Sequence, residues 1–77
     1  MKNGQAAMPA YNYSQLKART AELGKTNKAV AMAAGMTPST YSLKLNGKGE
    51  FTQEQIVRIM EFLDIGSADV HRYFFSL

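Results

Sequence analysis

Two threonines, Thr26 and Thr37, each open a short helical segment in the middle of the chain, and a glycine separates the segments. Thr is a favoured N-cap because its hydroxyl accepts a hydrogen bond from a free N–H of the first turn. Pro38 takes the first position of the second helix, where its missing N–H costs nothing. Gly35 allows a tight turn at positive φ. Two short helices joined by such a turn form a helix-turn-helix unit.

These two helices also carry the packing residues that the unit needs. Val30 is placed to point into the core, and Ala31 is small where the next helix crosses it. Tyr41 faces back into the core from the second helix, which ends near Leu45 or Asn46. A generic helical hairpin needs no such combination, so the sequence favours the helix-turn-helix interpretation.

A helical pattern before this unit begins at Asn12 or Tyr13 and runs to Leu23, where Gly24 stops it. Its core-facing positions share one helical face: Tyr13, Leu16, Thr20 and Leu23. After the unit, Thr52 and Gln55 form a capping-box signature, and Phe51 is placed to staple onto Ile56. The apolar stripe of that helix is Ile56, Ile59, Met60 and Leu63. A last pattern starts at Ser67 and carries Val70, Tyr73, Phe74 and Phe75.

Five short helical patterns and no strand pattern predict a compact, all-α, five-helix domain over residues 11–77. Residues 1–10 read as a flexible tail, in which Met8 is a candidate native start. A chain of 77 residues is expected to form one domain. It has no cysteine, so disulfides and thiolate metal sites are excluded.

The composition argues against several other classes of protein. The N-terminus has no secretory signal, and no apolar run approaches the roughly 20 residues of a membrane span. We therefore expect a cytoplasmic protein without a membrane partner. His71 is the only histidine, and it has no partner of obvious function in the sequence. The sequence predicts no enzyme, no catalytic residue, no metal, no cofactor and no small-molecule substrate.

The charges are distributed unevenly along the chain. Residues 1–49 hold seven Lys or Arg and one acid, a balance of +6, whereas residues 50–77 hold two and five, a balance of −3. A protein with one basic half can present a positive face to a polyanion such as DNA. Chance asymmetry on a solvated surface is the alternative.

The segment resembles the lambda-repressor-like helix-turn-helix family, which includes phage repressors and Cro proteins. The matching span, without a gap, is TNKAVAMAAGMTPSTYSLKLNG, residues 26–47. The resemblance extends over residues 13–75 and implies a five-helix domain with a central helix-turn-helix, bacterial or prophage-encoded. Two positions depart from the family pattern. Asn27 stands where Gln is common, and Lys44 stands where an apolar residue is usual, with the apolar Leu45 following it.

In this family the third helix lies in the major groove of DNA, and the resemblance assigns that role to residues 38–45. A helical wheel with Tyr41 inward gives the outward side chains, which we predict to contact bases: Ser39, Thr40, Ser42 and Leu43. No Arg or Gln is present there for a bidentate base contact, so direct readout should be modest. The residues predicted to contact phosphates flank the second, third and fourth helices: Lys25, Asn27, Lys28, Lys44, Asn46, Lys48 and Thr52. We expect the Lys44 stem to lie over the core while its ammonium reaches outward.

The C-terminal segment is unusually rich in aromatic residues. If Val70 and Phe74 complete the core, the remaining apolar side chains cannot all point inward with them. A partner or dimer surface is the preferred interpretation of those side chains, and fraying with partial exposure is the alternative. The side chains concerned are Tyr73, Phe75 and Leu77.

Two functional hypotheses follow. The first is a sequence-specific regulator of transcription, similar to a Cro protein or a short phage repressor, which binds double-stranded operator DNA. The second is a modulator or antirepressor of the same fold that acts by binding a cognate repressor. Accordingly, the expected partners are operator DNA, a second copy of the chain or a cognate repressor.

Overall fold

The computed structural model describes residues 11–77, so the predicted tail of residues 1–10 lies outside the described residues. The elements follow in the order α1 (Ser14–Glu22), α2 (Asn27–Ala33), α3 (Pro38–Leu45), α4 (Gln53–Phe62), a 3-10 turn η2 (Ser67–Asp69) and α5 (Val70–Phe74). No strand occurs in this part of the chain. The prediction of an all-α fold with five short helices is confirmed.

Three threonine hydroxyls fix where helices begin. The Oγ1 atoms of Thr26, Thr37 and Thr52 each accept a hydrogen bond from the backbone N–H of the third residue of the helix that follows. The distances are 3.1 Å at α2, 3.2 Å at α3 and 3.1 Å at α4. At α4 the Gln55 side chain also accepts from the backbone N–H of Thr52, which completes the predicted capping box. Each cap is worth about 1 kcal/mol to a helix, which matters for helices of only two or three turns.

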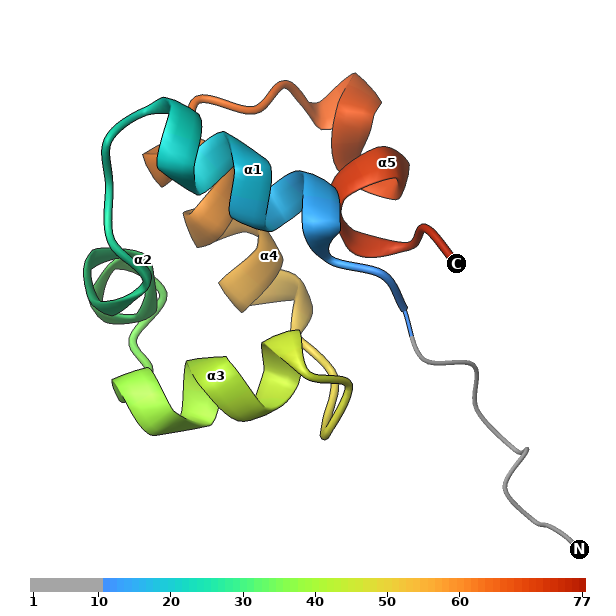
Figure 1. The fold of residues 1–77 in the computed structure, drawn as a ribbon. Helices are drawn as coiled ribbons and strands as arrows, with labels where there is room; N and C mark the ends of the chain where they lie inside the picture. Colours follow the sequence, from blue (N-terminus) through green and yellow to red (C-terminus); the bar gives the residue numbers. More distant parts are fainter. Residues whose placement is uncertain (1–10) are drawn as a thin grey trace, which may run out of the picture.

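The helices pack around α4, which lies in the middle of the domain (Figure 1). Helix α2 packs against both α3 and α4, while α1 packs against α5. Helix α3 therefore forms one edge of the molecule, away from α5 (Figure 1). The chain segment before α1 is tied to the C-terminal segment, because the N–H of Asn12 donates to the carbonyl of Ser76 at 2.7 Å.

Each main helix except α2 contributes a large, fully buried side chain to the core, and α2 contributes Val30 with the small Ala31. Of the four residues predicted to face the core from α1, three are buried: Tyr13, Leu16 and Thr20. The fourth prediction was wrong, because Leu23 is 37% exposed. Leu23 is the C-cap residue of α1, where the chain leaves the helix to reach the positive-φ Gly24.

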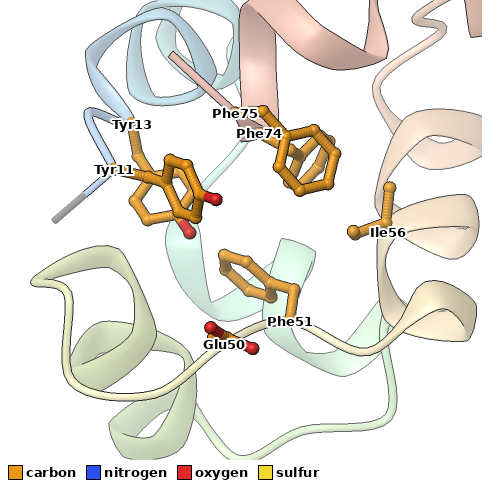
Figure 2. Close-up of a pocket in the computed structure, with 7 residues that line it drawn as sticks. All are labelled: Tyr11, Tyr13, Glu50, Phe51, Ile56, Phe74 and Phe75. Atoms are coloured by element: carbon orange, nitrogen blue, oxygen red, sulfur yellow. The ribbon is translucent and has the colours of Figure 1, made fainter. Parts of the chain in front are cut away.

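Phe51, in the loop between α3 and α4, sits at the centre of an aromatic cluster (Figure 2). Its ring packs edge to face on Tyr13 and Phe74, with centroid distances of 5.4 and 5.7 Å. It also packs at 5.8 Å on the ring of Tyr41 from α3. Such pairs contribute roughly 0.5–1.5 kcal/mol each beyond their area burial. One loop residue therefore joins α3, α5 and the start of α1.

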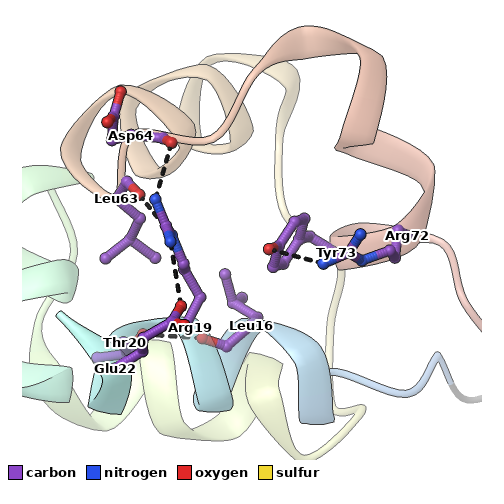
Figure 3. A network of polar contacts seen from close by, with 8 residues as sticks. All are labelled: Leu16, Arg19, Thr20, Glu22, Leu63, Asp64, Arg72 and Tyr73. Atoms are coloured by element: carbon purple, nitrogen blue, oxygen red, sulfur yellow. Dashed lines mark hydrogen bonds and ion pairs between the residues drawn. The ribbon is translucent and has the colours of Figure 1, made fainter.

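Arg19 joins α1 to the end of α4 (Figure 3). Its guanidinium donates to the carbonyls of Leu63 and Asp64 at 3.0 and 3.1 Å and pairs with Glu22 at 3.0 Å. These carbonyls follow the last turn of α4, where a positive charge is favourable. Asp64 has a φ of 54°, a left-handed conformation that ends the helix.

Helix α5 differs from the prediction in two respects. The last segment is not one helix, because the 3-10 turn at Ser67–Asp69 precedes α5. Tyr73 and Phe74 are buried together, while Val70 is only half-buried. Tyr73, which was predicted to be on a partner surface, is therefore a core residue and 8% exposed. That part of the prediction was wrong, whereas Phe75 and Leu77 are exposed.

Replacing Arg19 with Met should lower the free energy of unfolding by about 1–3 kcal/mol, because two carbonyls lose a charged donor. Lys17→Met on the exposed face of the same helix is the matched control and should change it by less than about 0.5 kcal/mol. Urea unfolding followed by circular dichroism measures both. Equal effects of the two changes would contradict the role assigned to Arg19.

Burial raises the pKa of Tyr41 to about 12 from 10.0. The folded state therefore favours the neutral phenol, and its contribution is complete below pH 10 and is lost as the pH rises toward 12. The difference of about two pKa units corresponds to roughly 2–3 kcal/mol. Tyr41→Phe should reduce the loss of stability between pH 9 and 12 by about that amount, measured by urea unfolding at several pH values. If Tyr41→Phe lost as much stability over this pH range as the parent protein, the role assigned to the buried Tyr41 phenol would be contradicted.

Candidate functional site

Helix α3 presents the outward face that the sequence predicts. Its four predicted base-contacting side chains are all exposed, whereas Tyr41 and Leu45 on the opposite side are buried. Leu43 is 52% exposed, which is unusual for a leucine in the middle of a helix. The hydroxyl of Thr37 donates to that of Thr40 at 3.0 Å, so the Thr40 hydroxyl is partly engaged within the helix. The DNA contacts themselves remain predictions.

The turn between α2 and α3 has the geometry expected of a helix-turn-helix. Gly35 has a φ of 75°, in the left-handed region that favours glycine. Met36 follows it, with its side chain buried and its N–H bonded to the carbonyl of Ala31 at 2.8 Å. These contacts hold α3 against α2, so the direction of the α3 outer face is fixed by the core rather than by the loop.

The end of α3 accommodates the unusual order of Lys44 and Leu45. The helix stays regular to Leu45, and the N–H of Asn46 is shared between the carbonyls of Ser42 and Leu43. Gly47, with a φ of 82°, then turns the chain. Because the last turn tightens in this way, Leu45 is buried and Lys44 lies at the edge of the core.

Lys44 does not extend outward from the protein as expected. Its ammonium donates to the carbonyl of Glu50 at 2.5 Å and lies 6.0 Å from the centroid of the Phe51 ring. The expectation of an outward ammonium was wrong. The Lys44 stem lies at the edge of the core, and the nearby Glu50 carbonyl holds the ammonium across the α3–α4 loop. A phosphate contact by Lys44 would have to use one of the two N–H donors that this hydrogen bond leaves free.

The other predicted phosphate-contacting residues fall into two groups. Asn27 and Lys28 are exposed at the start of α2, and Asn46 and Lys48 are exposed just after α3. Two residues are engaged elsewhere. Lys25 is half-buried with its ammonium 4.4 Å from the centroid of the Phe62 ring, and the Thr52 hydroxyl caps α4. The exposed cations beside α3 are therefore Lys28 and Lys48, and no ion pair involves either of them within residues 11–77.

An apolar groove lies between α4, η2 and α5, and it includes Phe75 of the predicted partner surface. It has a volume of about 600 Å³. Val57 and Phe75 are its most exposed apolar side chains, at 52% and 38%, and Glu61 adds a carboxylate. The remaining lining residues are Gln53, Ile56, Met60, Ile65, Ser67 and Val70. Two sequence features point to it: Phe75 in the aromatic C-terminal segment, and Val57, an apolar residue outside the stripe of α4.

A smaller aromatic pocket adjoins this groove and shares two of its walls, Ile56 and Phe75. Its volume is about 90 Å³, and its other lining residues are Tyr11, Tyr13, Glu50, Phe51 and Phe74. Burial raises the pKa of Tyr13, and the negative charges of Tyr11 and Glu50 raise it further.

The structure gives no geometry for metal chemistry within residues 11–77, since no three His, Asp or Glu side chains gather where they would hold an ion. Nor is any helix in that range both long and apolar enough to cross a membrane.

Comparison with known proteins identifies the family. The family model described as "Protein of unknown function (DUF739)" matches residues 8–77. The chain belongs to this family. Among solved structures it is similar to the solution structure of the modulator of repression (MOR) of the temperate bacteriophage TP901-1 from Lactococcus lactis. The two share 33% sequence identity over 86% of this chain and 89% of that chain, with a TM-score of 0.70. No curated protein sequence matches the chain.

Lys44→Gln should loosen the α3–α4 loop, because the Glu50 carbonyl loses its charged donor. We expect amide hydrogen exchange at Lys48, whose N–H bonds to the Leu43 carbonyl at 2.9 Å, to accelerate by about three- to tenfold, the effect of a hydrogen bond worth roughly 1 kcal/mol. Lys28→Gln, in α2, is the control and should leave exchange at Lys48 unchanged. Unchanged exchange in Lys44→Gln would contradict the anchoring role.

Proposed function

We propose that this protein is a phage-type regulatory protein that modulates a repressor by binding to it. The similarity to the modulator of repression carries this proposal, since it spans most of both chains at 33% identity. The family description assigns no function, so the support comes from this neighbour and from the surface of the domain.

The composition of α3 supports a protein partner over DNA as the main target. Its outer face carries three hydroxyl side chains and Leu43, and its one cation, Lys44, is bound to the Glu50 carbonyl. Sequence-specific DNA recognition relies chiefly on Arg, Lys, Asn and Gln at base edges. The α3 face therefore offers few of the side chains that read bases, which weakens the case for DNA as the main target.

The groove between α4, η2 and α5 is the surface that we assign to the partner. Its apolar lining and half-exposed Val57 and Phe75 offer a place where an apolar segment would lose its contact with water. Clustered apolar exposure of this kind usually marks a contact site. Glu61 at the groove favours a segment that also carries a positive charge.

Two aliphatic side chains of equal exposure test which of the two surfaces binds the repressor. Val57 and Leu43 are both 52% exposed, one in the groove and the other on α3. We expect Val57→Ser to weaken binding to the repressor encoded beside this gene by about tenfold, the equivalent of 1.4 kcal/mol. Leu43→Ser should leave it within about twofold. Isothermal titration calorimetry measures both.

The opposite ranking would place the repressor on α3 instead. Absence of any complex at micromolar concentrations, with both proteins folded, would contradict the proposed function.

Binding of operator DNA by the protein alone is the second candidate, and the exposed helix-turn-helix face with Lys28 and Lys48 beside it favours it. If the protein binds DNA in this way, its affinity for DNA should fall as the salt concentration rises. The slope of log K against log salt concentration should be about −0.9 per phosphate contact. Lys48→Ala should then reduce that slope by about one contact for every DNA sequence, whereas Ser39→Ala should alter the preference between sequences. Equal affinity for scrambled DNA, or no salt dependence, would contradict this candidate.

A further inference from the structure

The aromatic pocket brings together residues from four parts of the chain (Figure 2). Tyr11 and Tyr13 enter from the segment before α1, and Glu50 and Phe51 come from the α3–α4 loop. Ile56 belongs to α4, and α5 with the residue after it closes the opposite wall. Its volume of about 90 Å³ is several times the roughly 10–15 Å³ that a single water needs on the same measure. The pocket therefore has room for a small side-chain head group.

The ring orientations make this pocket an aromatic box. Neighbouring rings stand nearly perpendicular, at 89° for Tyr11 and Phe75, 90° for Tyr13 and Phe51, and 87° for Phe51 and Phe74. Aromatic rings in several orientations therefore line the enclosed space. Ring faces carry partial negative charge and attract cations within about 6 Å of their centroids.

A carboxylate adds a full negative charge to this box. Glu50 lines the pocket and is exposed, and no ion pair engages it within residues 11–77. Its charge acts on the buried phenol of Tyr13, whose pKa is raised chiefly by burial and further by Tyr11 and Glu50. The site therefore combines aromatic faces with a free carboxylate, which disfavours an anion and favours a cation.

Two basic residues, Lys44 and His71, lie near the box without lining it. Lys44 lies 6.0 Å from the Phe51 centroid, but its ammonium is bound to the backbone carbonyl of Glu50 and it is absent from the pocket wall. His71 packs beside Phe75 at 6.3 Å, also outside the pocket. The carboxylate of Glu50 and the ring faces of the interior thus remain available to a cation from outside.

We propose that this aromatic pocket receives the cationic side chain of a Lys or Arg from the protein that binds in the neighbouring groove. The source follows from continuity, because Ile56 and Phe75 line both the pocket and the groove. A segment lying in the groove passes the mouth of the pocket and can place one side chain inside it. This inference rests on the proposed function, and it gives the partner segment a chemistry: apolar, with one cation.

The first test needs no partner. Full-length protein is titrated with butylammonium chloride, which copies a lysine side chain, at constant ionic strength, and the aromatic ring resonances are followed by NMR. Saturable shifts of Tyr11, Phe51 and Phe75 are expected, with a dissociation constant in the millimolar range. The neutral alcohol 1-pentanol, which is one carbon longer and more hydrophobic, should still bind at least about threefold more weakly, the effect of a modest cation–π contribution.

Matched variants separate the pocket from general electrostatics. Glu50→Gln should weaken butylammonium binding by about threefold or more, and Tyr11→Leu should weaken it by a similar factor. Glu61→Gln removes an exposed carboxylate from the groove but not from the pocket, and it should leave the affinity unchanged. Equal binding of pentanol, no saturable binding of butylammonium, or equal effects of Glu50→Gln and Glu61→Gln would overturn the proposal.

The second test uses the repressor. Glu50→Gln should weaken the complex by at least about threefold, and butylammonium should compete with the repressor whereas pentanol at the same concentration should compete less. If the repressor binds with an affinity indifferent to Glu50 and Tyr11, the pocket proposal fails and the proposed function stands. If butylammonium binds selectively but no repressor complex forms, the proposed function fails and the assignment to a repressor side chain fails with it.

Discussion

The packing of Phe51 is the contact on which the rest of this domain depends. Its ring is in contact with Tyr13 before α1, Tyr41 in α3 and Phe74 in α5. These segments are distant in the sequence, and a domain of this size has little buried surface to spare. Phe51 also connects the core to the surface. Its inner contacts build the core, and its outer side forms a wall of the aromatic pocket.

The two candidate surfaces differ in how they are stabilised. Helix α3 is positioned by local features: the Thr37 cap, the positive φ of Gly35 and the burial of Tyr41. The groove is formed by α4, η2 and α5, which meet only in the folded domain. Its shape therefore responds to how α5 docks, and the edge-to-face contact of Tyr11 with Phe75 ties that docking to the segment before α1. A partner in the groove would contact elements that the whole core supports.

The sequence predicted the helices well because each start and turn depends on local chemistry. The three threonine caps, the capping box at Gln55 and the glycine turn were all confirmed. The predictions that failed depend on long-range geometry. Tyr73 is buried together with Phe74, and the Lys44 ammonium binds the Glu50 carbonyl across the α3–α4 loop. The hydrophobic periodicity of the sequence does not predict either feature.

The sequence by itself determined where α2, α3 and α4 begin and which side chains α3 presents, since capping and helical spacing act over a few residues. Only the tertiary structure decided which lysines stay exposed, how α5 is rotated and that Ile56 and Phe75 line both a groove and an aromatic pocket. The reason is physical: these features are set by contacts between elements far apart in the chain, and their geometry exists only after the core has packed.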